Sequence, residues 1–453
     1  MIHQFTIRDI HIALDVNSGA VHVLDDQASQ VLACFDQDGQ PEPEKLEALK
    51  QQYGAQTIEE ACFELNDMIA RGLLFSKDPY EALFSRSSGP TVVKALCLHI
   101  AHDCNLKCKY CFAGEGNYHG QKTQMSLEVA KRAIDFVIEN SANRKNIEID
   151  FFGGEPLLNL DTVKGTVNYA REKEKTSGKR FRFTITTNGV LLKPEELDYL
   201  NDTMDNIVLS LDGRKDVHDR MRCRKDGSGS YDAIVPKFQQ MAAKRGNRDY
   251  YVRGTYTASN LDFSTDVLYM ADLGFDQLSV EPVVLPDGSS FEIRKEHLPI
   301  LFKEYEKLAD ELLKVRKKGR KVNFFHYMID LEGGPCVAKR LRGCGSGTEY
   351  LAVTPQGDLY PCHQFAGISE FRLGDIYSGI NRPDITDVFK GINVYTKKAC
   401  RQCWARFYCS GGCAANAWNF QKDLSGVYEI GCELQKKRVE CALWLKAMEQ
   451  AEE

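Results

Sequence analysis

The sequence predicts an α/β protein whose centre is a partial (β/α)6 TIM-like barrel, preceded by a winged-helix-like module and followed by a cysteine-rich region. Apolar strand-like segments alternate with amphipathic helical segments between residues 92 and 284, which indicates a parallel sheet. The 453 residues suit two or three domains, each able to bury its own core. We predict domains over residues 1–85, 92–320 and 336–453.

The N-terminal domain begins with a β-hairpin. Residues 10–24 alternate apolar and polar positions around Asn17-Ser18-Gly19, a pattern typical of two strands joined by a tight turn. Helical patterns follow over residues 27–35, 42–53 and 58–72. A hairpin with three helices predicts a winged-helix-like module, and the polar residues 84–90 predict a linker to the next domain.

The central domain contains six strand patterns and the helices that connect them. The predicted strands cover residues 94–100, 147–152, 181–187, 206–211, 251–257 and 277–283. The predicted helices cover residues 126–139, 160–175, 194–202, 231–245 and 262–273. A charged helix over 296–318 follows, then a Cys/Gly-rich stretch over 336–432 without enough aliphatic periodicity for a conventional core, and a final helix over 433–449.

Cysteine usage and charge restrict the environment and the partners. The chain has 16 cysteines and begins without a signal-peptide pattern, which predicts a cytoplasmic, reducing location where clustered cysteines bind metal. A net charge of -6 argues against a protein that coats nucleic acid. No apolar run approaches membrane-spanning length, so we expect neither a nucleic acid nor a membrane partner.

The first cysteine group, Cys104, Cys108 and Cys111, follows the first predicted barrel strand directly. Three thiolates on one short loop can hold three irons of a [4Fe-4S] cluster and leave the fourth iron open for a chelating substrate. A structural zinc loop is the alternative. It requires a fourth Cys or His at paired spacing, and none follows in the right register before Cys223.

This segment resembles the radical S-adenosylmethionine (SAM) superfamily, in which CxxxCxxC with an aromatic residue before the last cysteine, here Tyr110, is the defining motif. Three further segments match the superfamily and follow the second, third and fourth strands: Phe151-Phe-Gly153-Gly154-Glu155-Pro156, Thr187-Asn-Gly189 and Ser210-Leu-Asp-Gly213. The resemblance implies that the Gly-Gly-Glu-Pro segment binds the methionine amino group of SAM. Glycines allow close backbone approach, and Glu155 offers a counter-charge.

Three further residues complete the predicted SAM site: two are assigned by resemblance, and the role of the third is left open. By resemblance, Ser210 and Arg222 contact the ribose or carboxylate of SAM, and a forked guanidinium suits a carboxylate. Glu281 ends the sixth predicted strand. It either lines the pocket or faces water as an ordinary strand-end carboxylate.

The second cysteine group lies in the C-terminal region and resembles the SPASM domain, which binds two auxiliary [4Fe-4S] clusters. The resemblance implies that Cys344, Cys362 and Cys413 hold auxiliary cluster I. It implies in the same way that Cys400, Cys403, Cys409 and Cys432 hold auxiliary cluster II. A disulfide scaffold and a pair of zinc knuckles are the alternatives.

The remaining cysteines divide into one candidate ligand and a group of ordinary thiols. Cys336 either supplies a fourth ligand to cluster I or leaves an iron open for a substrate thiolate. Five further cysteines read most simply as small hydrophobic residues: Cys34, Cys62, Cys97, Cys223 and Cys441.

The N-terminal module, in this setting, resembles a RiPP recognition element, the domain that captures leader sequences of ribosomally made peptides. The match covers residues 13–24 and the helices after them. A leader peptide would pair with the exposed hairpin edge and seat its apolar side chains on the third helix. The alternative is an accessory domain that merely packs on the barrel.

Together these features resemble radical SAM/SPASM peptide maturases, and within them the sactisynthases that mature six-cysteine (SCIFF) peptides. That resemblance implies that the substrate is a ribosomal precursor peptide with a leader and a Cys-rich core. It implies a flavodoxin- or ferredoxin-like electron donor. It also implies a 5′-deoxyadenosyl radical that initiates formation of a thioether between a cysteine sulfur and an α-carbon. One rival is an anaerobic sulfatase maturase, which is disfavoured because His363 stands where that family usually has Asp. The other is a non-enzymatic iron–sulfur redox or sensor protein.

Overall fold

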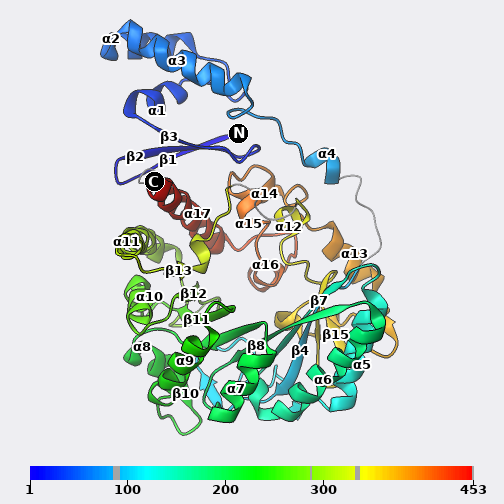
Figure 1. Ribbon diagram of the computed structural model, residues 1–453. Coiled ribbons are helices and arrows are strands. Elements are labelled where there is room, and N and C mark those ends of the chain that lie inside the picture. Colours follow the sequence, from blue (N-terminus) through cyan, green and yellow to red (C-terminus); the bar gives the residue numbers. More distant parts are fainter. Residues whose placement is uncertain (85–91, 286–287, 332–336, 451–453) are drawn as a thin grey trace.

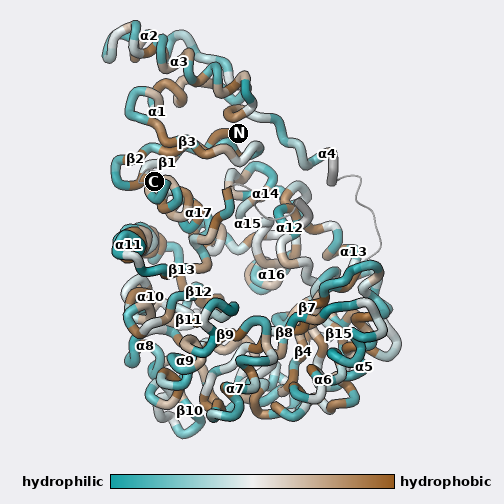
Figure 2. The backbone as a smooth tube through the Cα atoms, viewed as in Figure 1, coloured by the Kyte–Doolittle hydropathy of each residue, from teal (hydrophilic) through white to brown (hydrophobic). Residues whose placement is uncertain are grey.

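The computed structural model describes residues 1–84, 92–285, 288–331 and 337–450. Figure 1 shows the N-terminal module at one end, the central sheet with its helices at the other, and the C-terminal helices α14 to α16 between them. In Figure 2 the strands of the central sheet carry many of the hydrophobic segments, whereas helix α2 is largely hydrophilic. The C-terminal region therefore lies between the other two parts of the chain.

The central sheet contains the six predicted parallel strands in their predicted order. They are β4 (Ala95–His102), β7 (Asn146–Gly153), β8 (Arg180–Thr187), β9 (Asn206–Ser210), β11 (Tyr250–Tyr256) and β12 (Gln277–Pro282). Each pairs in parallel with the next. β13 (Asn323–Phe324) extends this sheet beyond β12, and among the described strands it does not pair back to β4, so the barrel is open.

Helices cover the sheet because each carries one apolar face. They are α5 (Leu127–Asn140), α6 (Leu160–Ser177), α7 (Pro194–Thr203), α9 (Tyr231–Arg245), α10 (Phe263–Asp272) and α11 (Leu298–Lys317). Ser126 caps α5 by accepting a hydrogen bond from the Val129 amide. All eight residues of β4 are buried, which is the pattern of a parallel strand covered on both faces.

Shorter elements surround the carboxyl ends of these strands. The cysteine-loop strand β5 (Leu106–Cys108) pairs with β10 (Arg222–Arg224), which follows helix α8 (Lys215–Met221), and β6 (Thr123–Gln124) pairs with β4. None of these elements was predicted. No helix in the described part of the chain is both long and apolar enough to cross a lipid bilayer.

The C-terminal region corrects the expectation that it lacks a conventional core. Strands β14 (Tyr350–Val353), β15 (Asp358–Tyr360), β16 (Gly374–Asp375) and β17 (Gly379–Ile380) continue the central sheet on the far side of β4. Leu351, Val353 and Leu359 are fully buried there. Aliphatic periodicity was too weak to reveal these strands because each has only two to four residues.

Helices complete the C-terminal region. They are α12 (Val337–Arg342), α13 (Pro383–Gly391), α14 (Lys398–Arg401), α15 (Arg406–Cys409), α16 (Ala414–Gln421) and α17 (Glu429–Gln450). α17 begins four residues before the helix predicted over 433–449 and packs along α11. Cys432 therefore lies on a helix and not in the loop before it.

The N-terminal module has one strand more than predicted. β1 (Ile2–Ile7) pairs with β2 (Ile10–Asp15), which also pairs with β3 (Val21–Leu24), so β2 is the central strand. Helices α1 (Asp26–Leu32), α2 (Pro43–Tyr53) and α3 (Ala55–Ala70) follow at the predicted places, and α4 (Glu81–Phe84) comes after them. The extra strand leaves β3 at one edge of a three-stranded sheet.

Polar contacts attach this module to the C-terminal region. Arg406 donates from Nη2 to Asn17 Oδ1 at 2.7 Å and to Asp78 Oδ2 at 3.0 Å. Tyr395 also donates its hydroxyl to Asp78, at 2.9 Å. The His3 ring stacks on Trp404 with 3.6 Å between ring centroids. The N-terminal sheet thus rests directly on the short helices that carry the C-terminal cysteines.

Candidate functional site

The Cys104 loop leaves the carboxyl end of β4 and forms one wall of a cavity of about 440 Å³. Cys104, Cys108 and Cys111 all line this cavity. The loop is held on its outer side by the pairing of β5 with β10, in which Cys108 lies opposite Arg222. Three thiols from one loop therefore border a single space at the strand ends, where ligand sites of parallel α/β folds gather.

Two glycines allow the cysteine loop to pack against the end of β7. A Cβ atom on Gly154 would lie 2.1 Å from the Asp103 carbonyl oxygen, and one on Gly116 would lie 2.7 Å from Cys104 Cβ. Either contact is too short for two non-bonded atoms. The Gly-Gly sequence after β7 is thus required for the backbone contact that closes this side of the cavity.

Glu155 is a brace between strand ends, and its carboxylate does not project into open space. Its side chain is buried and accepts hydrogen bonds from the Leu157 amide at 3.0 Å, the Thr187 hydroxyl at 2.8 Å and the Asn188 amide at 2.8 Å. The Asn188 side chain in turn donates to Cys104 Sγ at 3.7 Å. Burial raises the pKa of Glu155 to about 7 despite these donors.

A buried carboxylate orients the aromatic residue of the cysteine motif and the predicted SAM arginine. Asp212 accepts a hydrogen bond from the Tyr110 hydroxyl at 2.6 Å and from Arg222 Nε at 2.9 Å. Asp212 is fully buried, and Arg222 lines the cavity. The ion pair uses one edge of the Arg222 guanidinium and fixes its position at the cavity wall.

Most of the residues predicted to contact SAM line the cavity, and one does not. Tyr110, Gly153, Gly154, Glu155, Ser210 and Arg222 line the cavity together with the three cysteines. Pro156 is buried and does not line it. Of the two readings of Glu281, the structure favours the pocket-lining one, since Glu281 lines the cavity with its side chain 33% exposed.

The donor set fits an iron–sulfur cluster. Burial raises the pKa of Cys104 and of Cys108 to about 12, so both are thiols without metal, and iron binding must displace their protons. No three Cys, His, Asp or Glu side chains within the described ranges lie close enough to share a single metal ion. A cluster does not require that convergence, because each of its irons takes one thiolate.

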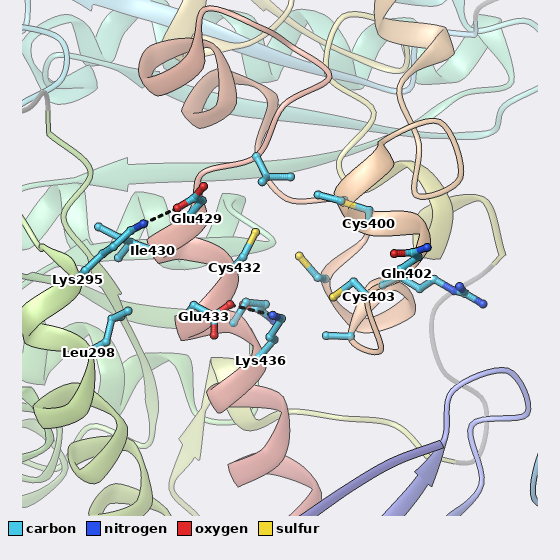
Figure 3. Close-up of a pocket in the computed structure, with 17 residues that line it drawn as sticks. Lys295, Leu298, Cys400, Gln402, Cys403, Glu429, Ile430, Cys432, Glu433 and Lys436 are labelled. Atoms are coloured by element: carbon cyan, nitrogen blue, oxygen red, sulfur yellow. Dashed lines mark hydrogen bonds and ion pairs between the residues drawn. The ribbon is translucent and has the colours of Figure 1, made fainter. Parts of the chain in front are cut away.

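The four cysteines predicted to hold auxiliary cluster II line one cavity of about 570 Å³: Cys400, Cys403, Cys409 and Cys432. Figure 3 shows Cys432 on its helix facing Cys400 and Cys403 across this space. The three segments that supply these residues are α14 with the turn after it, the end of α15, and α17. The ion pairs of Lys295 with Glu429 and of Lys436 with Glu433 lie at its edge.

The cysteines predicted for auxiliary cluster I lie near one another. Burial, and then the neighbouring Cys413 and Cys344 thiols, raise the pKa of Cys362 to about 12. Cys413 also lines the cavity of the Cys104 loop. A C-terminal thiol thus borders the same space as the first cysteine group, whereas Cys336 lies outside the described residues.

Sequence reasoning missed three residues that build this site. Asp212 and Asn188 belong to the segments after β9 and β8 that were identified, but their buried hydrogen bonds were not foreseen. Arg253 on β11 lines the cavity and carried no motif. Its charge within an otherwise apolar strand pattern was the only available signal.

Residues 98–270 match the family described as the radical SAM superfamily and are thus similar to a radical SAM domain. Such a domain implies a [4Fe-4S] cluster and SAM. The match includes Cys104, Cys108, Cys111, Glu155 and Arg222.

Relatives extend the similarity beyond this domain. The chain is 25% identical over 343 residues to the antilisterial bacteriocin subtilosin biosynthesis protein AlbA of Bacillus subtilis, covering 71% of this chain and 67% of AlbA. It is also 25% identical over 338 residues to a cysteine-type anaerobic sulfatase-maturating enzyme of Clostridium novyi, covering 69% of this chain and 86% of that enzyme.

The fold as a whole is similar to Streptococcus suis SuiB bound to S-adenosylmethionine. The TM-score is 0.55 at 16% identity, and the match covers 95% of this chain and 98% of SuiB. SuiB has also been solved bound to the precursor peptide SuiA. The chain therefore contains a segment that matches the radical SAM superfamily, is similar in sequence to maturases, and has a fold similar to that of SuiB over nearly its full length.

Proposed function

We propose that this protein is a radical SAM peptide maturase that forms thioether crosslinks, from cysteine sulfur to α-carbon, in a ribosomally synthesised cysteine-rich peptide. One observation carries the proposal. Cys413 of the C-terminal region lines the same cavity as Cys104, Cys108 and Cys111. A substrate in that cavity would lie between two groups of metal-binding thiols.

Three clusters are part of this proposal. Cys104, Cys108 and Cys111 would hold a [4Fe-4S] cluster with one iron left open for SAM to chelate. Auxiliary cluster II takes the four cysteines of the 570 Å³ cavity. Auxiliary cluster I takes Cys344, Cys362 and Cys413, and Cys336 either completes it or leaves an iron open for a substrate thiolate.

The SAM contacts follow from the cavity wall. The backbone at Gly153 and Gly154 receives the methionine moiety, and Arg222, fixed by Asp212, pairs with its carboxylate. Ser210 lies at the end of β9 on the same wall. When bound, the reduced cluster and SAM supply the abstraction of a hydrogen atom from an unactivated C–H bond.

The chain's own part is to orient the peptide and to exclude water. Forming a C–S bond from a thiol and a C–H bond removes two hydrogens from the peptide. One leaves as a hydrogen atom, which the 5′-deoxyadenosyl radical would take, and one leaves as a proton. One electron is also released, and an auxiliary cluster would accept it. The C-terminal segments line one side of the cavity with His363, Gln364, Cys413 and Asn416. Walls on this side would hold the reacting carbon and sulfur near each other and limit the access of water.

A leader peptide is proposed to bind the N-terminal module by strand addition. Among the described strands β3 pairs only with β2, so its other edge has no strand beside it. Val23 on β3 is 55% exposed and Phe63 on α3 is 76% exposed, so the edge strand and the third helix each present apolar surface. The relation to AlbA and the SuiB–SuiA complex support a peptide substrate.

The similarity to a sulfatase-maturating enzyme supports one rival, the oxidation of a single Cys or Ser side chain. The two activities have different products. Thioether formation joins two residues with loss of two hydrogens per crosslink, whereas side-chain oxidation leaves no crosslink. A flavodoxin- or ferredoxin-like protein would supply electrons in either case.

The test is anaerobic reconstitution with iron and sulfide, followed by incubation with SAM, dithionite and candidate cysteine-rich peptides. We expect 5′-deoxyadenosine and a peptide mass loss of two hydrogens per crosslink. Replacement of Cys104, Cys108 and Cys111 together by Ala should abolish both products because the open iron is lost.

The matched control is Cys223→Ala, since Cys223 lies on β10 beside the same loop but outside the motif. This variant should retain 5′-deoxyadenosine formation. Reductive SAM cleavage by the triple variant would contradict the cluster assignment, and a peptide oxidised without a crosslink would favour the rival activity.

A further inference from the structure

A carboxylate and a guanidinium lie where two cavities of this protein meet. Glu281 near the end of β12 lines both the 440 Å³ cavity and a second one of about 230 Å³ enclosed by C-terminal segments. Arg253 on the neighbouring strand β11 lines the first cavity. Its Nη2 lies 3.6 Å from Glu281 Oε1, and the two side chains are 56% and 33% exposed.

The polar atoms of this pair lack close partners in the protein. Glu281 has three cationic or imidazole neighbours, and their nitrogens lie 3.6 to 3.8 Å from its oxygens. These separations exceed normal hydrogen-bond lengths. Within the described residues, neither Glu281 nor Arg253 makes a side-chain hydrogen bond. Partly buried polar groups such as Glu281 usually do, whereas the more exposed Arg253 is open to solvent in the cavity. Both therefore have bonding capacity that faces a cavity.

Two buried side chains support the carboxylate from behind. Arg438 of α17 and His326 are each only 7% exposed, and Arg438 is fixed by donating from Nε to the Tyr305 hydroxyl at 2.9 Å. Burial by itself would raise the pKa of Glu281, but His326, Arg438 and Arg253 lower it to about 2. Glu281 is therefore an ionised acceptor at neutral pH.

The pair matches the chemistry of a peptide main chain. Each peptide unit offers one N–H donor and one C=O acceptor, and these two groups complement a carboxylate and a guanidinium. Glu281 lines both cavities, together with Pro282, Val284, Cys413 and Asn416, so it lies on the boundary that a peptide extending from the Cys104 loop toward the C-terminal cavity would meet.

We propose that Glu281 and Arg253 form a main-chain binding subsite that holds a peptide amide of the substrate at the junction of the two cavities. The proposal rests on the peptide substrate proposed above. It adds two positioning residues that no recognised motif of the sequence contains, and it makes no use of a particular side chain of the substrate.

The test uses the reconstituted protein with SAM and a defined probe, the capped tripeptide acetyl-Gly-Cys-Gly-amide, with binding followed by ligand-observed NMR. Glu281→Gln and Arg253→Met should each weaken tripeptide binding about tenfold or more, since each removes a charge-assisted hydrogen bond. Arg253→Met keeps the test decisive if Glu281→Gln perturbs folding. The affinity for SAM should stay unchanged in both.

The matched control is Asp249→Asn. Asp249 forms the same kind of pair with Arg182, at 3.5 Å, but lies before β11 at the opposite end of the sheet. Equal tripeptide affinity in all variants, or no binding to the parent protein, would overturn the subsite. So would a loss of SAM affinity in place of tripeptide affinity, because the pair would then serve the cofactor. Binding is measured without turnover, so a failure to form thioethers would count against the proposed function only.

Discussion

The two cysteine-lined cavities are built in opposite ways. The Cys104 loop follows β4, a strand buried along its whole length in a sheet covered by long helices. The cysteines of the 570 Å³ cavity come from α14 and α15, which have four residues each, and from α17. Helices of four residues have no stability of their own. In the first region the folded sheet positions the thiols. In the second region we expect the proposed cluster to hold the short helices in place.

The apolar packing of the second region depends on the N-terminal module. A separate core cluster joins Val394, Phe407 and Leu443 of the C-terminal region to Leu14 and Val16 of the N-terminal sheet. The main core, by contrast, is dominated by the strands and helices of the central domain. Loss of the cluster proposed for the second cavity should therefore also destabilise the N-terminal sheet.

The largest expected effect comes from removing that group. Cys400→Ser with Cys403→Ser should lower the free energy of unfolding of the C-terminal region by several kcal/mol, because metal-ligand bonds then no longer hold the short helices. Hydrogen exchange should rise in α14, α15 and the β1–β2 pair, while β7 and β8 stay protected. The Ala variant of the Cys104 loop should leave exchange in the sheet unchanged.

Cys62→Ser is the control for this experiment, because Cys62 lies partly buried on α3, away from both cysteine cavities. It should change exchange little. Equal loss of protection from the two sets of cluster variants would contradict the distinction between the two cavities.

An intermediate effect is expected from Glu155→Gln, which tests how the fold positions the first loop. As pH falls below about 7 the buried carboxyl gains a proton, and its capacity to accept from Asn188 and Thr187 declines. SAM affinity should therefore fall about tenfold from pH 8 to pH 6 in the parent protein. The Gln variant should bind more weakly at pH 8, with a flatter dependence on pH.

Isothermal titration calorimetry measures the SAM affinity of both proteins at each pH. Protonation of SAM itself affects both affinities equally, so it cancels in their ratio. Glu148→Gln provides the control because Glu148 is exposed on the same strand, β7. An unchanged ratio from pH 6 to pH 8 would show that the Glu155 brace does not govern the site.

The smallest effect is expected at the contact between the N-terminal module and the C-terminal region. Asn17→Ala removes the acceptor of Arg406 Nη2 and a donor to the Ser76 carbonyl oxygen at 2.8 Å. We expect a loss of about 1–3 kcal/mol in docking stability, since one partner is charged. Faster hydrogen exchange in β1 and β2 should report it. Ser18→Ala, next to it and more exposed, should have no comparable effect, and equal exchange in the two variants would contradict the role of Asn17.

Much of the fold was predictable because its signals are local. Six parallel strands and five of their helices lie where hydrophobic periodicity placed them, and the segments after β7, β8 and β9 were identified by their glycines. Strands β14 to β17 were missed because two to four residues cannot show a period. β1 was missed because its residues are mostly half-buried and give no clear alternation.

The candidate site was predictable in part. The four cysteines that line the 570 Å³ cavity were grouped by resemblance to the SPASM domain. The brace from Glu155 through Asn188 to Cys104 was not foreseen, because it joins loops from different strands and leaves no spacing in the sequence. The same holds for Asp212, which orients both Tyr110 and Arg222. Buried polar contacts of this kind depend on which strands are neighbours.

The sequence by itself determined which thiols share a loop and which strands carry ligand-binding turns, because short spacings and periodicities act through the nearby backbone. Only the tertiary structure decided that Cys413 joins the cavity of Cys104, and that Glu281 and Arg253 meet at its edge. The reason is that the carboxyl ends of parallel strands converge after the whole sheet has formed, and the chain segments that cover them are brought there by packing alone.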